Sequence, residues 1–206
     1  MRIVIATRNS RKAAEMRRVL ERILGERFQF PDLSDYPQFP EPEESADTYA
    51  ENAAIKARAA CEALSVACIS DDAGLEVDAL GGAPGVKSKR FGGEDLPFSD
   101  KMRLILERMN GMPAAERGAR FRCAVAFSEP NSETRVFEST CEGQIAAKPR
   151  GSGGFGYDPI FLIPEKGKTF AEMSPEEKDS VSHRGKVLAD FAEWLRSRYT
   201  AELPHL

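Results

Sequence analysis

The chain has 206 residues, of which 41% are hydrophobic and 30% charged, and its formal net charge is −4 at pH 7. This length and apolar content suffice for one substantial core, so we expect a single domain spanning residues 1–206. The acidic balance excludes a general nucleic-acid-binding protein, because such proteins need surplus Lys and Arg to displace counterions from phosphates.

The first part of the chain is predicted to form a strand, a polar loop and a helix. Residues 2–6 are an apolar run typical of a buried strand. After Arg11 the apolar positions follow helical spacing, at Met16, Val19, Leu20, Ile23 and Leu24. A short strand over residues 28–30 comes next, and then a proline- and acid-rich loop over residues 31–47. A loop of that length is usually functional or disordered.

The next segment is predicted to place an acidic pair between two strands. Thr48-Tyr49-Ala50-Glu51 fits the capping box of a helix, which we expect to run to about Leu64. A strand over residues 66–70 follows, and Asp71-Asp72 separates it from a short strand over residues 75–77. Ser99 is a candidate cap for a helix that ends near Met109.

The second half combines a hairpin, a glycine-rich loop and a final helix. Residues 121–128 and 134–142 are predicted strands joined by a Pro130-Asn131 turn. Residues 160–163 form another strand, and Ser174-Pro175-Glu176-Glu177 supplies a second capping box. The last helix carries its apolar side chains on one side, at Val187, Leu188, Phe191, Trp194 and Leu195. This order of elements predicts an α/β fold on a mixed sheet.

Two features indicate a reducing, non-membrane location. No apolar run reaches the about 18 residues of a membrane-spanning helix, and the first run ends at Thr7, too early for a signal peptide. The chain has four cysteines, which are Cys61, Cys68, Cys123 and Cys141. Their spacing matches neither a C-x-x-C pair nor a metal-binding pattern. We therefore expect a soluble cytoplasmic protein with no membrane partner and with packed, reduced thiols.

The first loop is a candidate phosphate-binding segment. Thr7-Arg8-Asn9-Ser10-Arg11-Lys12 lies between a strand and a helix start, where backbone N–H groups and the helix dipole attract anions. Lys12 adds a mobile ammonium group. An ordinary polar connection explains the spacing equally well, and the loop is not a Walker A sequence.

The segment Gly151–Gly156 matches G-x-G-x-x-G, but its context excludes a dinucleotide fingerprint. That fingerprint needs a strand before it and a helix after it, whereas here Pro149 precedes it and Pro159 follows. A shaped loop is predicted instead. Such a loop allows a ligand to approach its backbone, and Phe155 offers a ring on which a base can stack.

Asp71-Asp72-Ala73-Gly74 is the candidate acidic centre, predicted at the end of an apolar strand. Adjacent side chains on an extended backbone point to opposite faces, so we expect one of the two aspartates to face a site. Mg²⁺ takes one or two carboxylates plus substrate phosphates. Further candidate ligands lie in the long loop, at Glu41, Glu43, Glu44 and Asp47. A capped turn is the alternative interpretation of the pair.

Taken together, these motifs resemble a known family. T-x-N-x-x-K, E-N-A-x-x-K-A, D-D-x-G-L, L-G-G-x-P-G, G-x-G-G-F-G-Y-D-P-I-F and E-E-K-x-x-x-S-H-R-G occur in this order between Ile3 and about Leu188. The sequence resembles the inosine and xanthosine triphosphate pyrophosphatases, which remove deaminated purine nucleotides from the precursor pool. The resemblance implies an elongated mixed sheet flanked by helices, two lobes with a central cleft, and a homodimer.

The resemblance also implies roles for individual residues. Asp72 would be the proton acceptor and a metal ligand, Glu44 the second metal-side carboxylate, and Mg²⁺ the cofactor, with Mn²⁺ as the alternative. The residues implied to grip the phosphates are Thr7, Arg8, Asn9, Ser10, Arg11, Lys12 and Lys56, with Ala73 beside the substrate. Those implied to hold the base and ribose are Phe155, Gly156, Tyr157 and Asp158, and those at the base edge are Lys178, His183 and Arg184.

Three positions depart from the family pattern. Arg8 and Arg11 stand where small residues, often Gly, are common, so they either stiffen the loop or bring extra cations to the phosphates. Ala73 replaces a frequent Ser or Thr, which removes a hydroxyl group.

The base-edge residues favour a 6-oxo purine. Lys178, Arg184 and a protonated His183 are hydrogen-bond donors, so a 6-amino group would leave them unpaired. ITP, dITP and XTP are therefore the expected substrates in preference to ATP. Guanine also carries a 6-oxo group, so its exclusion must come from contacts near position 2 of the base. The alternatives are a nucleotide-binding regulatory protein without catalysis and a pyrophosphatase for modified pyrimidine or methylated nucleotides.

Overall fold

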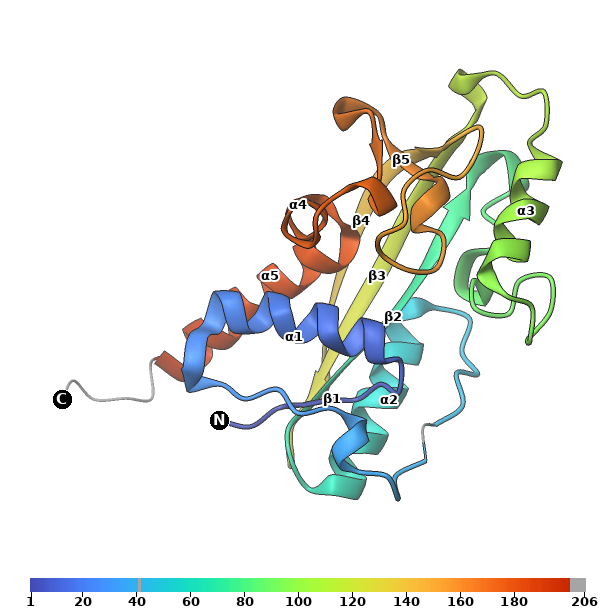
Figure 1. The fold of residues 1–206 in the computed structure, drawn as a ribbon. Helices are drawn as coiled ribbons and strands as arrows, with labels where there is room; N and C mark the ends of the chain where they lie inside the picture. The colour runs from blue at the N-terminus through green and yellow to red at the C-terminus, as the bar shows by residue number, and fades with distance from the viewer. Residues whose placement is uncertain (41, 201–206) are drawn as a thin grey trace. The chain divides into compact units, whose positions relative to one another are not determined.

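The computed structural model describes residues 1–40 and 42–200, and in them the chain forms a six-stranded mixed sheet with helices (Figure 1). The order in the sheet is β1-β2-β3-β4-β5-β6. β1 pairs with β2 in parallel, whereas β4–β5 and β5–β6 are antiparallel. The strands are β1 (Val4–Ile5), β2 (Cys68–Val77), β3 (Gly118–Ser128), β4 (Arg135–Ile145), β5 (Phe161–Ile163) and β6 (Lys168–Thr169). The predicted α/β fold on a mixed sheet is confirmed.

The α-helices of the described residues are α1 (Ser10–Leu24), α2 (Tyr49–Leu64), α3 (Phe98–Arg108), α4 (Pro175–Val181) and α5 (His183–Thr200). Short 3₁₀ turns occur in several of the connections between them. Within the described part of the chain, no helix is both long and apolar enough to cross a membrane.

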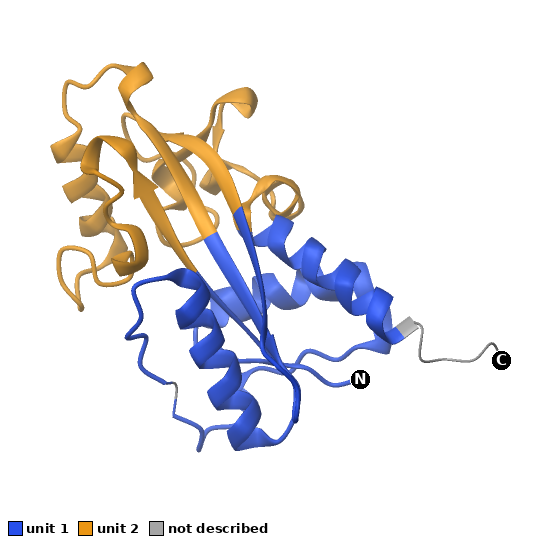
Figure 2. Cartoon of the chain, turned by 180° about the vertical axis from the view of Figure 1, so that it is seen from behind, with its two compact units in different colours: residues 1–72, 123–139, 184–206 blue, residues 73–122, 140–183 orange. Residues whose placement is uncertain are grey.

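The chain divides into two compact units (Figure 2). Unit 1 comprises residues 1–72, 123–139 and 184–206, and unit 2 comprises residues 73–122 and 140–183. Strands β2, β3 and β4 each contribute residues to both units. The single domain and the central cleft remain predictions.

In unit 1, both helices that flank the start of β2 follow their predicted patterns. The buried face of α1 includes Met16, Val19, Leu20 and Leu24. Helix α2 is capped by Thr48, whose hydroxyl accepts a hydrogen bond from the Glu51 amide at 3.1 Å. Its buried alanines at 53, 57 and 60 let the helix backbone pack closely in the core.

Unit 2 has an aromatic core of its own. The ring of Phe121 packs edge-on against Phe161 at 4.7 Å between centroids and stacks with Phe170 at 5.8 Å. Fully buried aliphatic side chains from β2 and α3, including Leu75 and Ile105, complete this cluster. The core supports the glycine-rich loop and α4 described below.

Three local predictions were wrong. Residues 28–30 form one isolated bridge, between Gln29 and Arg2, in place of a strand. Residues 68–70 and 75–77 belong to one strand, β2 (Cys68–Val77), so the acidic pair lies within a strand. Helix α3 begins at Phe98 without a side-chain cap. The predicted cap at Ser174 is present, since its hydroxyl accepts from the Glu177 amide at 3.1 Å, and the extended backbone of Ser182 (φ −71°, ψ 155°) separates α4 from α5.

The four thiols are reduced and buried in the described structure, as predicted. Burial raises the pKa values of Cys68 and Cys123 to about 12, so neither is a thiolate near neutral pH. We expect the thiols of the native protein to react with a reagent such as DTNB only slowly, at the rate at which the folded structure opens locally and exposes them. After unfolding in guanidinium, all four cysteines should react at once. Rapid labelling of the native protein would contradict this burial.

Candidate active site

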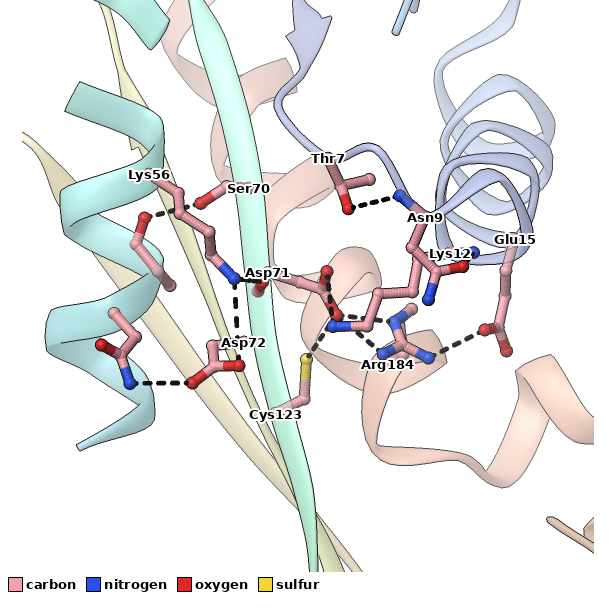
Figure 3. Close-up of polar contacts among 12 residues, drawn as sticks. Thr7, Asn9, Lys12, Glu15, Lys56, Ser70, Asp71, Asp72, Cys123 and Arg184 are labelled. Atoms are coloured by element: carbon pink, nitrogen blue, oxygen red, sulfur yellow. Dashed lines mark hydrogen bonds and ion pairs between the residues drawn. The ribbon is translucent and has the colours of Figure 1, made fainter. Parts of the chain in front are cut away.

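The acidic pair lies in the middle of β2, and its two side chains point to opposite faces of the strand (Figure 3). Asp71 faces α1 and the start of α5, whereas Asp72 faces α2. The exposed fractions of the two residues are 1% and 6%. The prediction that an extended backbone separates the two carboxylates is confirmed.

Asp71 is held by two cationic side chains. Arg184 donates to Asp71 Oδ2 from Nε at 3.0 Å and from Nη2 at 2.7 Å, and Lys12 Nζ lies 3.4 Å from Oδ1. Burial alone would raise the pKa of Asp71, but Lys12 and Arg184 lower it well below its usual range. Asp71 therefore stays anionic and is a poor proton acceptor near neutral pH.

Arg184, the second residue of α5, is buried between two carboxylates. Its Nη1 donates to Glu15 Oε2 at 2.8 Å, while its Nε and Nη2 donate to Asp71 Oδ2. Burial disfavours the charged guanidinium, but Asp71 and Glu15 raise its pKa well above the usual value. The implied role of Arg184 at the base edge remains a prediction; what the structure shows is a contact that fixes Asp71.

Asp72 lies beside the polar face of α2. Asn52 Nδ2 donates to Asp72 Oδ2 at 3.3 Å, and Lys56 Nζ lies 3.9 Å from Oδ1. The Lys56 ammonium also donates to Glu44 Oε1 at 2.5 Å and to the backbone oxygen of Asp71 at 2.7 Å. Lys56, predicted from a motif, thus links Asp72 to Glu44.

The pKa shifts of the two aspartates have opposite directions. Burial raises the pKa of Asp72, Lys56 and Lys12 oppose that shift, and the nearby carboxylates of Glu44 and Asp71 add to it, so the net shift is upward. The pKa of Asp71, its neighbour in the chain, is lowered. Neighbouring carboxyl groups whose environments push their pKa values apart are a recurring sign of divided roles in catalysis. Asp72 is the better candidate for a proton acceptor.

The donor set around Lys56 fits a hard divalent cation. Glu44 and Asp72 converge on one ammonium group, which shows that their oxygens face a space suited to positive charge. In residues 1–40 and 42–200 no group of three His, Cys, Asp or Glu side chains could hold a metal ion. Two carboxylates nevertheless match Mg²⁺ completed by substrate phosphates. Glu43 and Asp47 are exposed, and Glu41 lies outside the described residues.

The Thr7–Lys12 loop opens α1 and is closed by its own hydrogen bonds. Asn9 is the N-cap, and its Oδ1 accepts from the amides of Arg11 at 3.1 Å and Lys12 at 3.2 Å. The backbone N–H of Asn9 donates to Thr7 Oγ1 at 3.2 Å. Asn9 thus occupies two of the helix amides, and the helix dipole and the Lys12 side chain attract an anion to the same end of the helix. Ser10 and Arg11 are exposed.

A second group of predicted residues gathers in unit 2. Asp158 Oδ2 accepts from the Phe155 amide at 2.8 Å and from Lys178 Nζ at 2.7 Å. The Lys178 ammonium lies 4.8 Å from the centre of the Phe155 ring. Gly154 has φ +67°, and a Cβ there would lie 2.0 Å from Asp158 Oδ2, so this turn requires glycine. The loop is therefore built around a buried ion pair.

The other predicted residues of unit 2 have contacts of their own. The His183 ring stacks on Phe121 at 4.6 Å, and the Tyr157 hydroxyl donates to the Ser88 carbonyl at 2.9 Å. Gly156 has φ +65°, and Ala73 is half-buried in β2. That these unit 2 residues form one site with the acidic group of unit 1, meaning Asp71, Asp72 and the side chains that contact them, remains a prediction.

Three residues of the acidic group were missed from the sequence. They are Glu15, Asn52 and Cys123, the last of which places its Sγ 4.0 Å from Asp71 Oδ2. Glu15 gave a signal, because it is an acidic residue on the apolar face of α1. Asn52 lies inside the E-N-A motif, and its side chain also binds the backbone of Ala46.

The fold and the sequence were compared with known proteins. A Ham1 family model matches residues 3–194. A dITP/XTP pyrophosphatase from Geobacillus kaustophilus is 47% identical over 191 residues, covering 93% of this chain and 92% of that protein. A HAM1 protein from Coxiella burnetii superimposes with a TM-score of 0.84 at 36% identity, covering 96% of this chain and 99% of that one. A dITP/XTP pyrophosphatase structure from Mycobacterium abscessus gives a TM-score of 0.71 at 41% identity, covering 93% and 98%.

Proposed function

Because the chain belongs to the Ham1 family, we propose that it hydrolyses the deaminated purine nucleoside triphosphates ITP, dITP and XTP to the monophosphate and pyrophosphate. The relatives named as dITP/XTP pyrophosphatases support the substrate class. The observation that carries the chemistry is the unequal acidic pair, in which Arg184 fixes Asp71 as an anion and burial raises the pKa of Asp72.

Asp72 is the proton acceptor in this proposal. Hydrolysis between the α and β phosphates needs a water molecule held in line with the bond that breaks. Asp72 orients this water and takes its proton as the new phosphorus–oxygen bond forms. Asn52 fixes the Asp72 carboxylate through its 3.3 Å hydrogen bond, so the acceptor oxygen has a defined position.

Lys12 and Lys56 stabilise the leaving pyrophosphate. Burial disfavours the charge of Lys56, but Asp72, Glu44 and Asp71 raise its pKa, so its ammonium stays protonated. Fixed positive charge in a water-poor site stabilises developing negative charge without reorganisation. Lys12, at the start of α1, adds a second ammonium group 3.4 Å from Asp71.

Asp72 and Glu44 are the residues that would hold Mg²⁺, with Mn²⁺ as the alternative. A bound divalent ion supplies charge neutralisation on phosphate oxygens and eases the deprotonation of water. The two carboxylates share Lys56 as a partner, which supports a cation position between them.

The unit 2 group selects the base in this proposal. The Phe155 ring offers a stacking face, and Lys178 and His183 present hydrogen-bond donors to a 6-oxo group. A 6-amino group would leave such donors unpaired, which is a strong basis for rejection. We further propose a cytoplasmic homodimer, which the family resemblance supports and sedimentation at several protein concentrations tests.

The function is tested by the products formed from ITP with Mg²⁺ present and after chelation with EDTA. We expect IMP and pyrophosphate in equal amounts with the metal and no release after chelation. A nucleotide-binding regulatory protein would bind ITP and release neither product. A pyrophosphatase for modified pyrimidine or methylated nucleotides would prefer those triphosphates to ITP in the same assay.

A further inference from the structure

The side chain of Arg8 gathers several backbone carbonyl groups of one neighbouring segment. Its Nη1 donates to the Leu33 oxygen at 3.2 Å. Its Nη2 donates to the oxygens of Tyr36 at 3.2 Å and Pro37 at 3.3 Å, and also to that of Phe39. Arg8 is an exposed residue, yet its guanidinium is directed at the backbone of residues 33–39.

This segment has little regular structure of its own. A 3₁₀ turn over Leu33–Asp35, closed by the bond from the Tyr36 amide to the Leu33 oxygen, begins it, and one further turn bond runs from the Phe39 amide to the Tyr36 oxygen. Pro37 and Pro40 have no amide hydrogen and cannot donate. Leu33 belongs to an apolar cluster with Val4 and Ala6, and Tyr36 and Phe39 pack against it. The Arg8 contacts add polar attachment of the backbone to this apolar packing.

The same connection continues to Glu44 and to helix α2. Glu44 contacts Lys56 at 2.5 Å, and Asn52 binds both the amide and the carbonyl of Ala46. The connection is thus attached near its start by Arg8 and near its end by Asn52. Arg8 itself belongs to the strand-to-helix loop that precedes α1.

We propose that Arg8 is a positioning residue that fastens residues 33–39 to the strand-to-helix loop and thereby holds Glu44 at Lys56. It stiffens this part of the molecule and does not bind the phosphates. Its effect on turnover rests on the proposed function of Glu44, whereas its effect on the backbone does not. An arginine suits the role because its planar group presents several donors in fixed directions.

The proposed attachment of residues 33–39 by Arg8 is tested by amide hydrogen exchange in the Arg8→Ala protein. We expect the Tyr36 and Phe39 amides to exchange about tenfold faster, because several side-chain-to-backbone bonds are lost together. Arg11→Ala, which removes an exposed arginine from the same loop, is the matched control and should leave these rates unchanged. Millimolar methylguanidinium should restore slow exchange in Arg8→Ala, and sodium chloride at equal ionic strength should not. Unchanged exchange in Arg8→Ala would overturn the proposal.

The link to Glu44 is tested by a double-mutant cycle on kcat/KM for ITP. Arg8→Ala should lower kcat/KM about tenfold in the native background but less than about twofold when Glu44→Gln is already present. Equal losses in both backgrounds would mean that Arg8 acts on the phosphates directly and would overturn the proposal. If the wild-type protein fails to hydrolyse ITP, the proposed function fails, while the hydrogen-exchange result still decides whether Arg8 holds the segment.

Discussion

Replacing Asp72 with asparagine is expected to lower kcat for ITP by about a thousandfold, within the range that a positioned general base contributes. The amide keeps the size of the side chain and an oxygen for Asn52, but it cannot accept the proton from water. Nucleotide affinity should change less than about threefold, because the phosphate-facing cations remain. Pyrophosphate release and equilibrium binding of ITP measure the two quantities separately.

A matched control is Asp78→Asn, which removes a half-exposed carboxylate that pairs with Arg120 in unit 2. This variant should keep wild-type turnover, since exposed ion pairs contribute little. Full activity in Asp72→Asn would show that another group takes the proton, and the roles assigned to the acidic pair would then be wrong.

Replacing Arg184 with methionine is expected to destabilise the protein by about 3–5 kcal/mol, because it leaves the buried carboxylates of Asp71 and Glu15 without this guanidinium. For a chain of this length, that loss corresponds to a fall in Tm of roughly 6–20 °C. Thermal and denaturant unfolding measure the change.

The control for this prediction is Arg103→Met, because the Arg103 side chain is 58% exposed and pairs with the surface carboxylates of Asp100 and Glu107. It should leave the stability close to that of the wild-type protein, because exposed ion pairs contribute little. Adding Asp71→Asn to Arg184→Met should recover part of the lost stability, since one uncompensated charge is removed. If Arg184→Met loses no more than Arg103→Met, the buried ion network is not a stabilising element.

Local patterns predicted those parts of the fold that depend on neighbouring residues. The α1 stripe, the Thr48 cap and the opposite orientations of Asp71 and Asp72 all follow from periodicity or from hydrogen bonds within one turn. These features are set by spacings of a few residues, so a single sequence contains them.

The position of the acidic pair within β2 could not be predicted from local patterns. Aspartate disfavours strands and favours turns, so the pair was expected to interrupt the strand. In the structure β2 continues because Arg184 and Lys56 compensate the two carboxylates, and these partners come from α5 and α2. Such compensation depends on tertiary contacts between distant positions in the chain.

The same reason explains the residues that were missed. Arg184 and Glu15 are 169 positions apart, and no spacing rule connects them. For Arg8, the sequence left open whether the cation stiffens its loop or binds phosphate. The hydrogen bonds that the guanidinium donates to carbonyl oxygens of residues 33–39 support the first, which is the role we propose.

The central claim is tested most directly by incubating the protein with an equimolar mixture of ITP and ATP at limiting concentration with Mg²⁺ and identifying every product. In such a competition the rates report the ratio of kcat/KM values. We predict that ITP is converted to IMP and pyrophosphate in equal amounts while ATP is consumed at least about a hundredfold more slowly. Equal consumption of both nucleotides, or release of IDP and phosphate, would contradict the account.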